Sequence, residues 1–152
     1  MIIAIGSDHR GYRLKEILKT FLSSKGYRVL DFGTHSEESF DYPDAAIPVG
    51  EAVASGKADF GILICMTGIG MSIAANKVRG IRAALVTALE FAELSRKHNN
   101  ANVICLQGGY VDPEDAKNFV LKFFTTDFEG GRHLRRIKKI EKYETSSQKD
   151  FS

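Results

Sequence analysis

The chain has 152 residues, 43% of them hydrophobic and 26% charged, which is typical of one globular domain. Its formal net charge of +2 is too small to indicate a nucleic-acid-binding surface. No apolar run approaches the roughly 20 residues needed to span a bilayer, and the first residues lack the basic and apolar regions of a signal peptide. We therefore expect a cytoplasmic protein without nucleic-acid or membrane partners.

Apolar runs alternate with helical patterns along the chain. Strands are predicted at 2–6, 28–32, 60–65, 81–86 and 103–106, and helices at 11–25, 45–55, 69–78, 88–97, 113–124 and 132–143. Continuously apolar strands that alternate with helices indicate a parallel sheet covered on both faces. The sequence thus predicts a single-domain, doubly wound (Rossmann-like) α/β fold with five strands and a C-terminal helix. The domain is expected to cover 1–143, followed by a polar tail at 144–152.

Local signals support several of these boundaries. Gly26 fits the position just after a helix, where a positive φ is common. Tyr42, Pro43 and Asp44 open the second helix. Asp112 followed by Pro113 is typical of a helix N-cap with proline at the first helical position.

Polar residues gather at three element ends. One group, Ser7–Gly11, follows the first strand, a second, Cys65–Ser72, follows the third, and a third, Lys97–Asn100, precedes the fifth. In open α/β sheets, ligands bind outside the carboxyl ends of the strands. We therefore expect a small-molecule site built from these clusters.

The glycine loop Thr67–Ser72 leads from a strand into a helix. Such a turn directs free backbone N–H groups and the positive end of a helix dipole at an anion. The loop is not a dinucleotide fingerprint, because Ile73 stands where a third glycine belongs, and it lacks the Gly-Lys-Ser/Thr of a P-loop. A tight structural turn and a cradle for a phosphate or oxyanion both remain open.

The two cysteines, Cys65 and Cys105, do not form a disulfide framework or a zinc-binding motif. Cys65 ends a strand beside the start of a helix, where the thiolate form is favoured. Free cysteine is more often a small buried apolar residue, and both interpretations remain open for Cys65. Cys105 lies within an apolar run and fits the second one.

Other titratable residues also have two interpretations. His98, at the end of a helix, is either an acid–base group or a cap. Asp8 and His9 could simply form a turn that caps the next helix. Arg132 and Arg136 are four residues apart and project from one helix face, where they make a fork for a phosphate or a solvated basic surface. Basic residues are concentrated here, since residues 128–152 carry seven Lys/Arg and four Asp/Glu.

Taken together, these clusters resemble the ribose-5-phosphate isomerase B family, which also includes galactose-6-phosphate isomerases. The resemblance covers the chain from residue 2 to about residue 140. The matching stretches are Gly6–His9, Asp41–Pro43, Ile64–Cys65, Thr67–Gly70, Ser72–Lys77, Gly80–Ala83, Ser95–Arg96, His98–Asn99, Glu129–His133 and Arg136.

The resemblance implies the interconversion of ribose 5-phosphate and ribulose 5-phosphate without a metal or organic cofactor. Cys65 would be the base that moves a proton between C1 and C2, and Thr67 would help to stabilise the enediolate. His98 would open the furanose ring. The family is dimeric with a site lined by both subunits, and some members pair dimers into tetramers.

The resemblance also implies a set of binding residues. Asp8, His9, Tyr42 and Asn99 would hold sugar oxygens. Arg132 and Arg136, with His9, would grip the phosphate. The loop residues expected to line the site are Met66, Gly68, Ile69, Gly70 and Met71.

Two features depart from the family pattern. Met66 stands beside the expected base where many relatives have glycine or serine, and positions 107–110 hold no arginine for the phosphate. An alternative substrate is a hexose 6-phosphate, such as allose or galactose 6-phosphate. A third hypothesis, a phosphate-binding module without catalysis, is disfavoured because binding alone requires no thiol.

Overall fold

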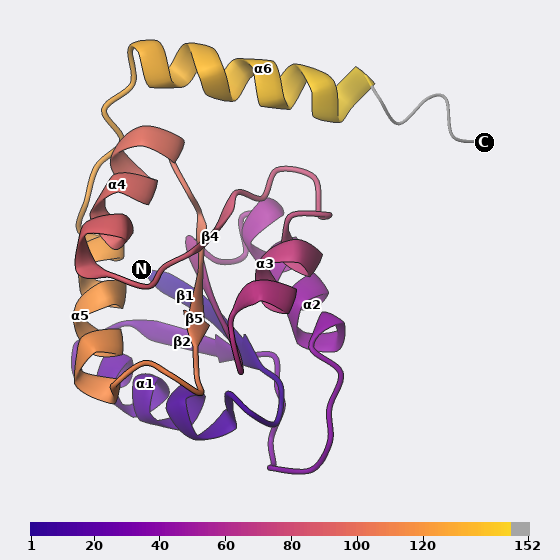
Figure 1. Cartoon of the computed structure of the whole chain (residues 1–152), viewed down its shortest axis with the longest axis vertical. Coiled ribbons are helices and arrows are strands. Elements are labelled where there is room, and N and C mark those ends of the chain that lie inside the picture. Colours follow the sequence, from indigo (N-terminus) through magenta and orange to yellow (C-terminus); the bar gives the residue numbers. More distant parts are fainter. Residues whose placement is uncertain (147–152) are drawn as a thin grey trace.

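The computed structural model describes residues 1–146, which form a parallel five-stranded sheet between two layers of helices (Figure 1). The strands are β1 (Ile2–Ser7), β2 (Arg28–Asp31), β3 (Phe60–Cys65), β4 (Ala83–Leu85) and β5 (Val103–Gln107). The helices are α1 (Tyr12–Ser24), α2 (Pro43–Ala54), α3 (Ile69–Ala75), α4 (Leu89–Asn99), α5 (Pro113–Phe124) and α6 (Arg132–Ser146). This architecture confirms the predicted doubly wound α/β fold.

The strand order β2-β1-β3-β5-β4 places the sheet's topological switch point between β1 and β3. The register pairs Ser7 with Ile64 and Cys65 with Gln107, so β1, β3 and β5 end close together. Ligands bind in the crevice outside such a switch point. The first two polar clusters of the sequence follow β1 and β3, and therefore lie at this crevice.

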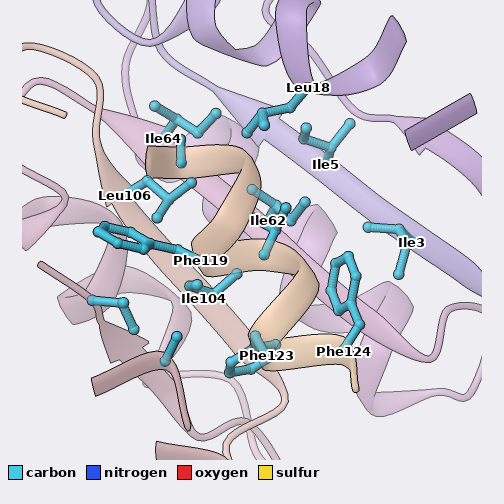
Figure 2. Close-up of a cluster of buried hydrophobic side chains, with 14 of the residues drawn as sticks. Ile3, Ile5, Leu18, Ile62, Ile64, Ile104, Leu106, Phe119, Phe123 and Phe124 are labelled. Atoms are coloured by element: carbon cyan, nitrogen blue, oxygen red, sulfur yellow. The ribbon is translucent and has the colours of Figure 1, made fainter. Parts of the chain in front are cut away.

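Two apolar clusters hold the helices against the sheet. On one face, α1, α4 and α5 pack on β1, β3 and β5, and Figure 2 shows Phe119, Phe123 and Phe124 of α5 over Ile62 and Ile104. On the other face, α2 and α3 pack through small residues, including Ala45, Ala46 and Ala75. Because these side chains are small, α3 and the loop before it lie close to the ends of the strands.

The sixth helix belongs to neither layer. It begins beside α4 and runs across one end of the molecule, at the top of Figure 1. Only His133 and Ile137 are buried on it. Within residues 1–146, no helix is long and apolar enough to cross a membrane.

Several predicted boundaries differ from the structure. The fourth strand is limited to Ala83–Leu85 rather than 81–86, and α3 ends at Ala75 rather than 78. Helix α6 continues to Ser146, three residues beyond its predicted end, because Glu144 accepts a hydrogen bond from the amide of Gly80 at 3.1 Å. The predicted polar tail thus begins within a helix, and its remaining residues, 147–152, lie outside the described residues.

A buried ion pair fixes the end of β2. The ammonium of Lys15 is fully buried and lies 2.6 Å from Oδ2 of Asp31, which also receives Lys19 at 2.7 Å. Burial by itself would raise the pKa of Asp31, but the hydrogen bonds from the two lysines outweigh it and hold that pKa below its usual value. The charged carboxylate therefore stabilises the fold.

We predict that Asp31→Asn lowers the free energy of unfolding by about 3 kcal/mol, because it leaves a buried ammonium without its main partner. Urea denaturation at pH 7 measures the change. For the wild type, the contribution of Asp31 is present above the pKa of the unfolded carboxyl, about 3.9, and is lost as pH falls through the lower folded value. Glu37→Gln, which breaks an exposed pair with Arg13, is the matched control and is expected to leave the urea midpoint unchanged.

Candidate active site

The loop after β1 is fastened to the end of β3. The amide of Asp8 donates to the carbonyl of Ile64 at 3.1 Å. The carboxylate of Asp8 is buried and accepts hydrogen bonds from the amides of Arg10 and Gly11, at 2.9 and 3.0 Å. Asp8 thus closes the turn that precedes α1, as one of its two interpretations predicted, while the N-cap position of the helix is Gly11. A buried carboxylate with both bonds on one oxygen leaves Oδ2 able to accept a ligand hydroxyl.

His9 follows on the same loop and is half-buried. Its Nδ1 lies 3.1 Å from the amide nitrogen of Phe40 and 3.3 Å from the carbonyl oxygen of the same residue. The tautomer decides which of the two contacts is the hydrogen bond, since a neutral ring nitrogen either accepts or donates. Either contact holds the His9 ring at the carboxyl edge of the sheet, beside Asp8.

Cys65 is the last residue of β3 and is 5% exposed. Its carbonyl receives the amide of Gly108 at 2.8 Å, which joins the loop after β3 to the loop after β5. Cys105 lies deeper on the same face of the sheet, and burial, with a smaller effect from the neighbouring Cys65, raises the pKa of its thiol far above the usual value. Cys105 is therefore held as the neutral thiol inside the core, whereas Cys65 lies at the strand end, next to the glycine loop.

We predict that iodoacetamide at pH 8 alkylates Cys65 and leaves Cys105 unmodified, because the thiolate is the reactive form. Peptide mass spectrometry measures the labelled fraction at each cysteine. Excess ribose 5-phosphate is expected to slow the labelling of Cys65. Equal labelling of the two cysteines in the folded protein would contradict the assignment.

The glycine loop is shaped by close approaches. Gly68 has φ +76°, and a Cβ there would lie 2.6 Å from Cδ1 of Leu85. A Cβ at Gly70 would lie 2.9 Å from the ring of Tyr42, so this ring packs directly on the loop. The hydroxyl of Thr67 accepts the amide of Ile69 at 3.2 Å. Thr67 thus takes up the first amide of α3, and the next amides of its first turn, those of Gly70 and Met71, have no carbonyl partner within the helix.

The methionine at position 66 is accommodated by a second glycine. The Met66 side chain lies across Gly109, where a Cβ would come within 2.3 Å of its sulfur. The backbone pairs there too, since the amide of Gly109 donates to the carbonyl of Met66 at 3.1 Å. Met66 is 39% exposed and lies just beyond the last residue of β3.

His98 and Asn99 do not join this group within one chain. Helix α4 runs back along the sheet, so its last turn lies at the amino edge, next to the residues that precede β5. There the carbonyl of Asn102 receives the amide of Gly61, near the start of β3. The length of β5 alone, roughly 16 Å at 3.3 Å per residue, separates the two edges. His98 is half-buried and Asn99 is exposed at that far edge.

Two arginines fix the end of α4, a role that the sequence did not indicate. Arg82 donates through Nε to the carbonyl of Asn99 at 2.9 Å and through Nη2 to that of Asn100 at 3.0 Å. Arg96 is buried, donates to the carbonyl of Ala101 at 2.6 Å and stacks on aromatic rings of the core. These bonds hold the backbone of the last turn of α4, which carries His98, in place.

Helix α6 completes this second group. The amide of Glu129 donates to the carbonyl of Lys97 at 3.2 Å, which places the start of α6 beside the end of α4. Arg132 and Arg136 are both exposed, one turn apart. His133, to which the sequence assigned no role, stacks on His98 with ring centroids 4.3 Å apart.

The predicted site residues thus form two half-sites on opposite edges of the sheet. The carboxyl-edge half-site holds the thiol and most of the loop, and the amino-edge half-site holds the imidazole and the arginines. Together they bring a thiol, a hydroxyl, backbone amides, an imidazole and two guanidinium groups to the ends of one α/β sheet. The fold and these groups are typical of an α/β enzyme that acts on a small anionic molecule. Its carboxyl-edge half-site comprises Asp8, His9, Tyr42, Cys65, Met66, Thr67, Gly68, Ile69, Gly70 and Met71, and its amino-edge half-site His98, Asn99, Arg132 and Arg136.

Comparison with known proteins identifies the family. The family model described as Ribose/Galactose Isomerase matches residues 3–140, and the chain belongs to this family. Ribose-5-phosphate isomerase B of Escherichia coli is 46% identical over 138 residues, which cover 91% of this chain and 93% of that protein.

Solved structures agree with this assignment. Ribose-5-phosphate isomerase B of Clostridium thermocellum superposes with a TM-score of 0.95 at 50% identity, covering 97% of this chain and 99% of the other. The enzyme of Mycoplasma genitalium with bound ribulose-5-phosphate gives a TM-score of 0.92 at 45% identity, with 95% and 97% covered.

Proposed function

We propose that this protein interconverts D-ribose 5-phosphate and D-ribulose 5-phosphate, a step of the pentose phosphate pathway, and that it acts in the cytoplasm without a metal or organic cofactor. The observation that carries the proposal is Cys65 at the switch point, beside a glycine loop that opens a helix. Relatives that cover nearly the whole chain bear this activity in their names, and one of them has been solved with ribulose 5-phosphate.

In this mechanism Cys65 takes the proton from C2 of the open-chain aldose and returns it to C1. Negative charge develops on the substrate oxygens as the enediolate forms. Thr67 and the amides from Gly68 to Met71 stabilise that charge, and each such donor contributes about 3–4 kcal/mol. Asp8 and Tyr42 hold the hydroxyl groups that orient the two carbons at the thiol.

The remaining steps need the amino-edge half-site. His98 moves the protons of ring opening, Asn99 binds a sugar oxygen, and Arg132 and Arg136, with His9, grip the phosphate. Because one chain separates these residues from Cys65 by the length of a strand, the complete site requires a second copy of the chain. The protein is therefore a homodimer with two shared sites, and dimers of this kind can pair further into tetramers.

Exposed apolar side chains support a second copy as the partner. They lie on α3, next to the glycine loop, and on the second half of α6. Apolar surface that is buried against another copy stabilises the dimer by about 25 cal/mol per Å². These side chains are Ile69, Ile73, Ile140 and Tyr143.

A turnover assay with ribose 5-phosphate and allose 6-phosphate, side by side and with a chelator present, tests the proposal. We expect a much higher kcat/KM on the pentose phosphate and no effect of the chelator. Preference for the hexose would keep the chemistry and replace the substrate. Binding of both sugars without turnover of either would overturn the isomerase function in favour of a phosphate-binding module.

A further inference from the structure

The amino-edge half-site contains a second histidine for which the proposed mechanism has no use. His133 is 5% exposed, and the planes of the His133 and His98 rings lie 11° from parallel at a centroid distance of 4.3 Å. Ring contacts of this kind restrict rotation about the side-chain torsions of both partners. His98 itself is half-buried, and the stack on His133 covers one face of its ring.

The surroundings of His133 leave one of its ring nitrogens unsatisfied, which lowers the stability of the folded protein. Its Nε2 is buried, and no partner lies at hydrogen-bonding distance among residues 1–146. The nearest carboxylate oxygen, on Glu129, is 3.6 Å away. A buried nitrogen without a partner carries a desolvation penalty that an apolar side chain of similar size would avoid. Packing of α6 alone therefore gives no reason for a histidine here.

The charges around His133 keep its ring neutral near pH 7. Burial lowers its pKa, and Arg132, His98 and Arg136 lower it further, while Glu129 acts in the opposite direction. A neutral ring can stack on His98 in either protonation state of His98 without adding a second positive charge. The stack is thus compatible with a ring that takes up and releases a proton during turnover.

We propose that His133 is a positioning residue for ring opening, because its buried ring is the flat support that holds His98 in the plane required for proton transfer. This inference rests on the proposed isomerase function. In ring opening the C1–O4 bond of the furanose breaks, the proton of the C1 hydroxyl leaves, and O4 receives a proton. Both protons are handled by the ring that His133 supports, and no other reactant is needed.

Glu129, His133 and His98 also have the composition of a metal triad, with ligand atoms within 4.8 Å of one another. However, near-parallel stacked rings keep their nitrogen lone pairs in two separate, nearly parallel planes, whereas ligands of one ion must point at a common centre. The arginines beside the rings, Arg132 and Arg136, also disfavour a cation. A metal site is therefore the alternative outcome of the test.

The test separates ring opening from proton transfer at carbon. Ribulose 5-phosphate cannot close to a furanose, because its C5 oxygen carries the phosphate. Exchange of its C1 proton with deuterium oxide thus requires Cys65 and bypasses ring opening. Isomerisation that starts from cyclic ribose 5-phosphate requires both steps.

For His133→Leu, which removes the flat ring, we expect isomerisation of ribose 5-phosphate to fall about 10- to 100-fold, as for a misplaced catalytic group. C1 exchange is expected to stay within about twofold, since the carboxyl-edge half-site is untouched. His133→Phe keeps a flat ring and is expected to restore most of the lost rate. The forward rate of the leucine variant should also stop rising with enzyme concentration, because spontaneous ring opening becomes limiting.

Ile137→Ala is the structural control. Ile137 is the other buried side chain of α6, so its loss lowers the melting temperature without changing the ratio of isomerisation to exchange. Lys139→Ala, at an exposed position of α6, is expected to change neither. Melting temperature and dimer size are measured for every variant.

An unchanged ratio in the leucine variant, or a phenylalanine variant as slow as the leucine one, would overturn the positioning role. A chelator that slows the wild type but not the leucine variant would also overturn it, and would assign a metal site instead. A wild-type protein with neither exchange nor turnover would mean that the proposed isomerase function itself is wrong.

Discussion

We expect that replacing Cys65 with alanine leaves a folded protein that still binds sugar phosphate but isomerises it far more slowly. A positioned general base contributes about 10²- to 10⁴-fold to a proton transfer, so we expect a loss of this size in kcat. C1 exchange of ribulose 5-phosphate in deuterium oxide should fall to the same extent, because it depends on the same thiol. The side chain is small, and its loss is expected to lower the free energy of unfolding by only about 1 kcal/mol.

Cys105→Ala is the matched control. Both thiols lie in the same apolar cluster, but Cys105 is fully buried within β5, whereas Cys65 ends β3 and is 5% exposed. Its loss is expected to lower stability and leave kcat within about twofold, since it is not a group that transfers protons in the mechanism. If Cys65→Ala kept its activity while Cys105→Ala lost it, the base would be misassigned. Simultaneous loss of binding and fold in the Cys65 variant would make Cys65 a packing residue.

The fold was predictable because most strands are apolar runs, and because the helices between them carry apolar residues at the spacing of one helix face. Boundaries were less predictable where tertiary contacts decide them. Helix α6 continues to Ser146 through the bond between Glu144 and Gly80, a partner 64 residues away that no local pattern reveals. The edge strand β4 has a partner on one side only, and its pairing stops at Leu85.

The position of the carboxyl-edge half-site was also predictable, since Asp8 directly follows β1 and Cys65 ends the adjacent strand β3. The separation of His98 from it follows from topology, because the helix that leads into a parallel strand ends at that strand's amino edge. His133 could not be found from sequence. Among the basic residues of α6, a histidine is expected to be exposed to solvent. Only the packing of α6 on α4 shows that the His133 ring is buried.

A heterodimer of a Cys65→Ala chain and a His98→Asn chain is expected to be active although each parent homodimer is nearly inactive on ribose 5-phosphate. In a shared site, the thiol comes from one chain and the imidazole from its partner. One of the two sites of the heterodimer then combines the intact thiol of the second chain with the intact imidazole of the first. Two affinity tags and sequential purification give the pure heterodimer, whose expected kcat per dimer is about half that of the wild type.

The reciprocal heterodimer makes the result unambiguous. A wild-type chain paired with a chain that carries both substitutions has no complete site if the sites are shared, since each site receives one altered group. If each site lay within a single chain, the wild-type chain would keep its own site, and this heterodimer would retain about half the activity while the first would have almost none. Both heterodimers contain one intact and one altered residue at each of positions 65 and 98. Shared sites predict that only the first heterodimer is active, and sites within one chain predict that only the second is. Because Cys65 and His98 lie at opposite edges of one sheet, we expect activity in the first heterodimer and its loss in the second.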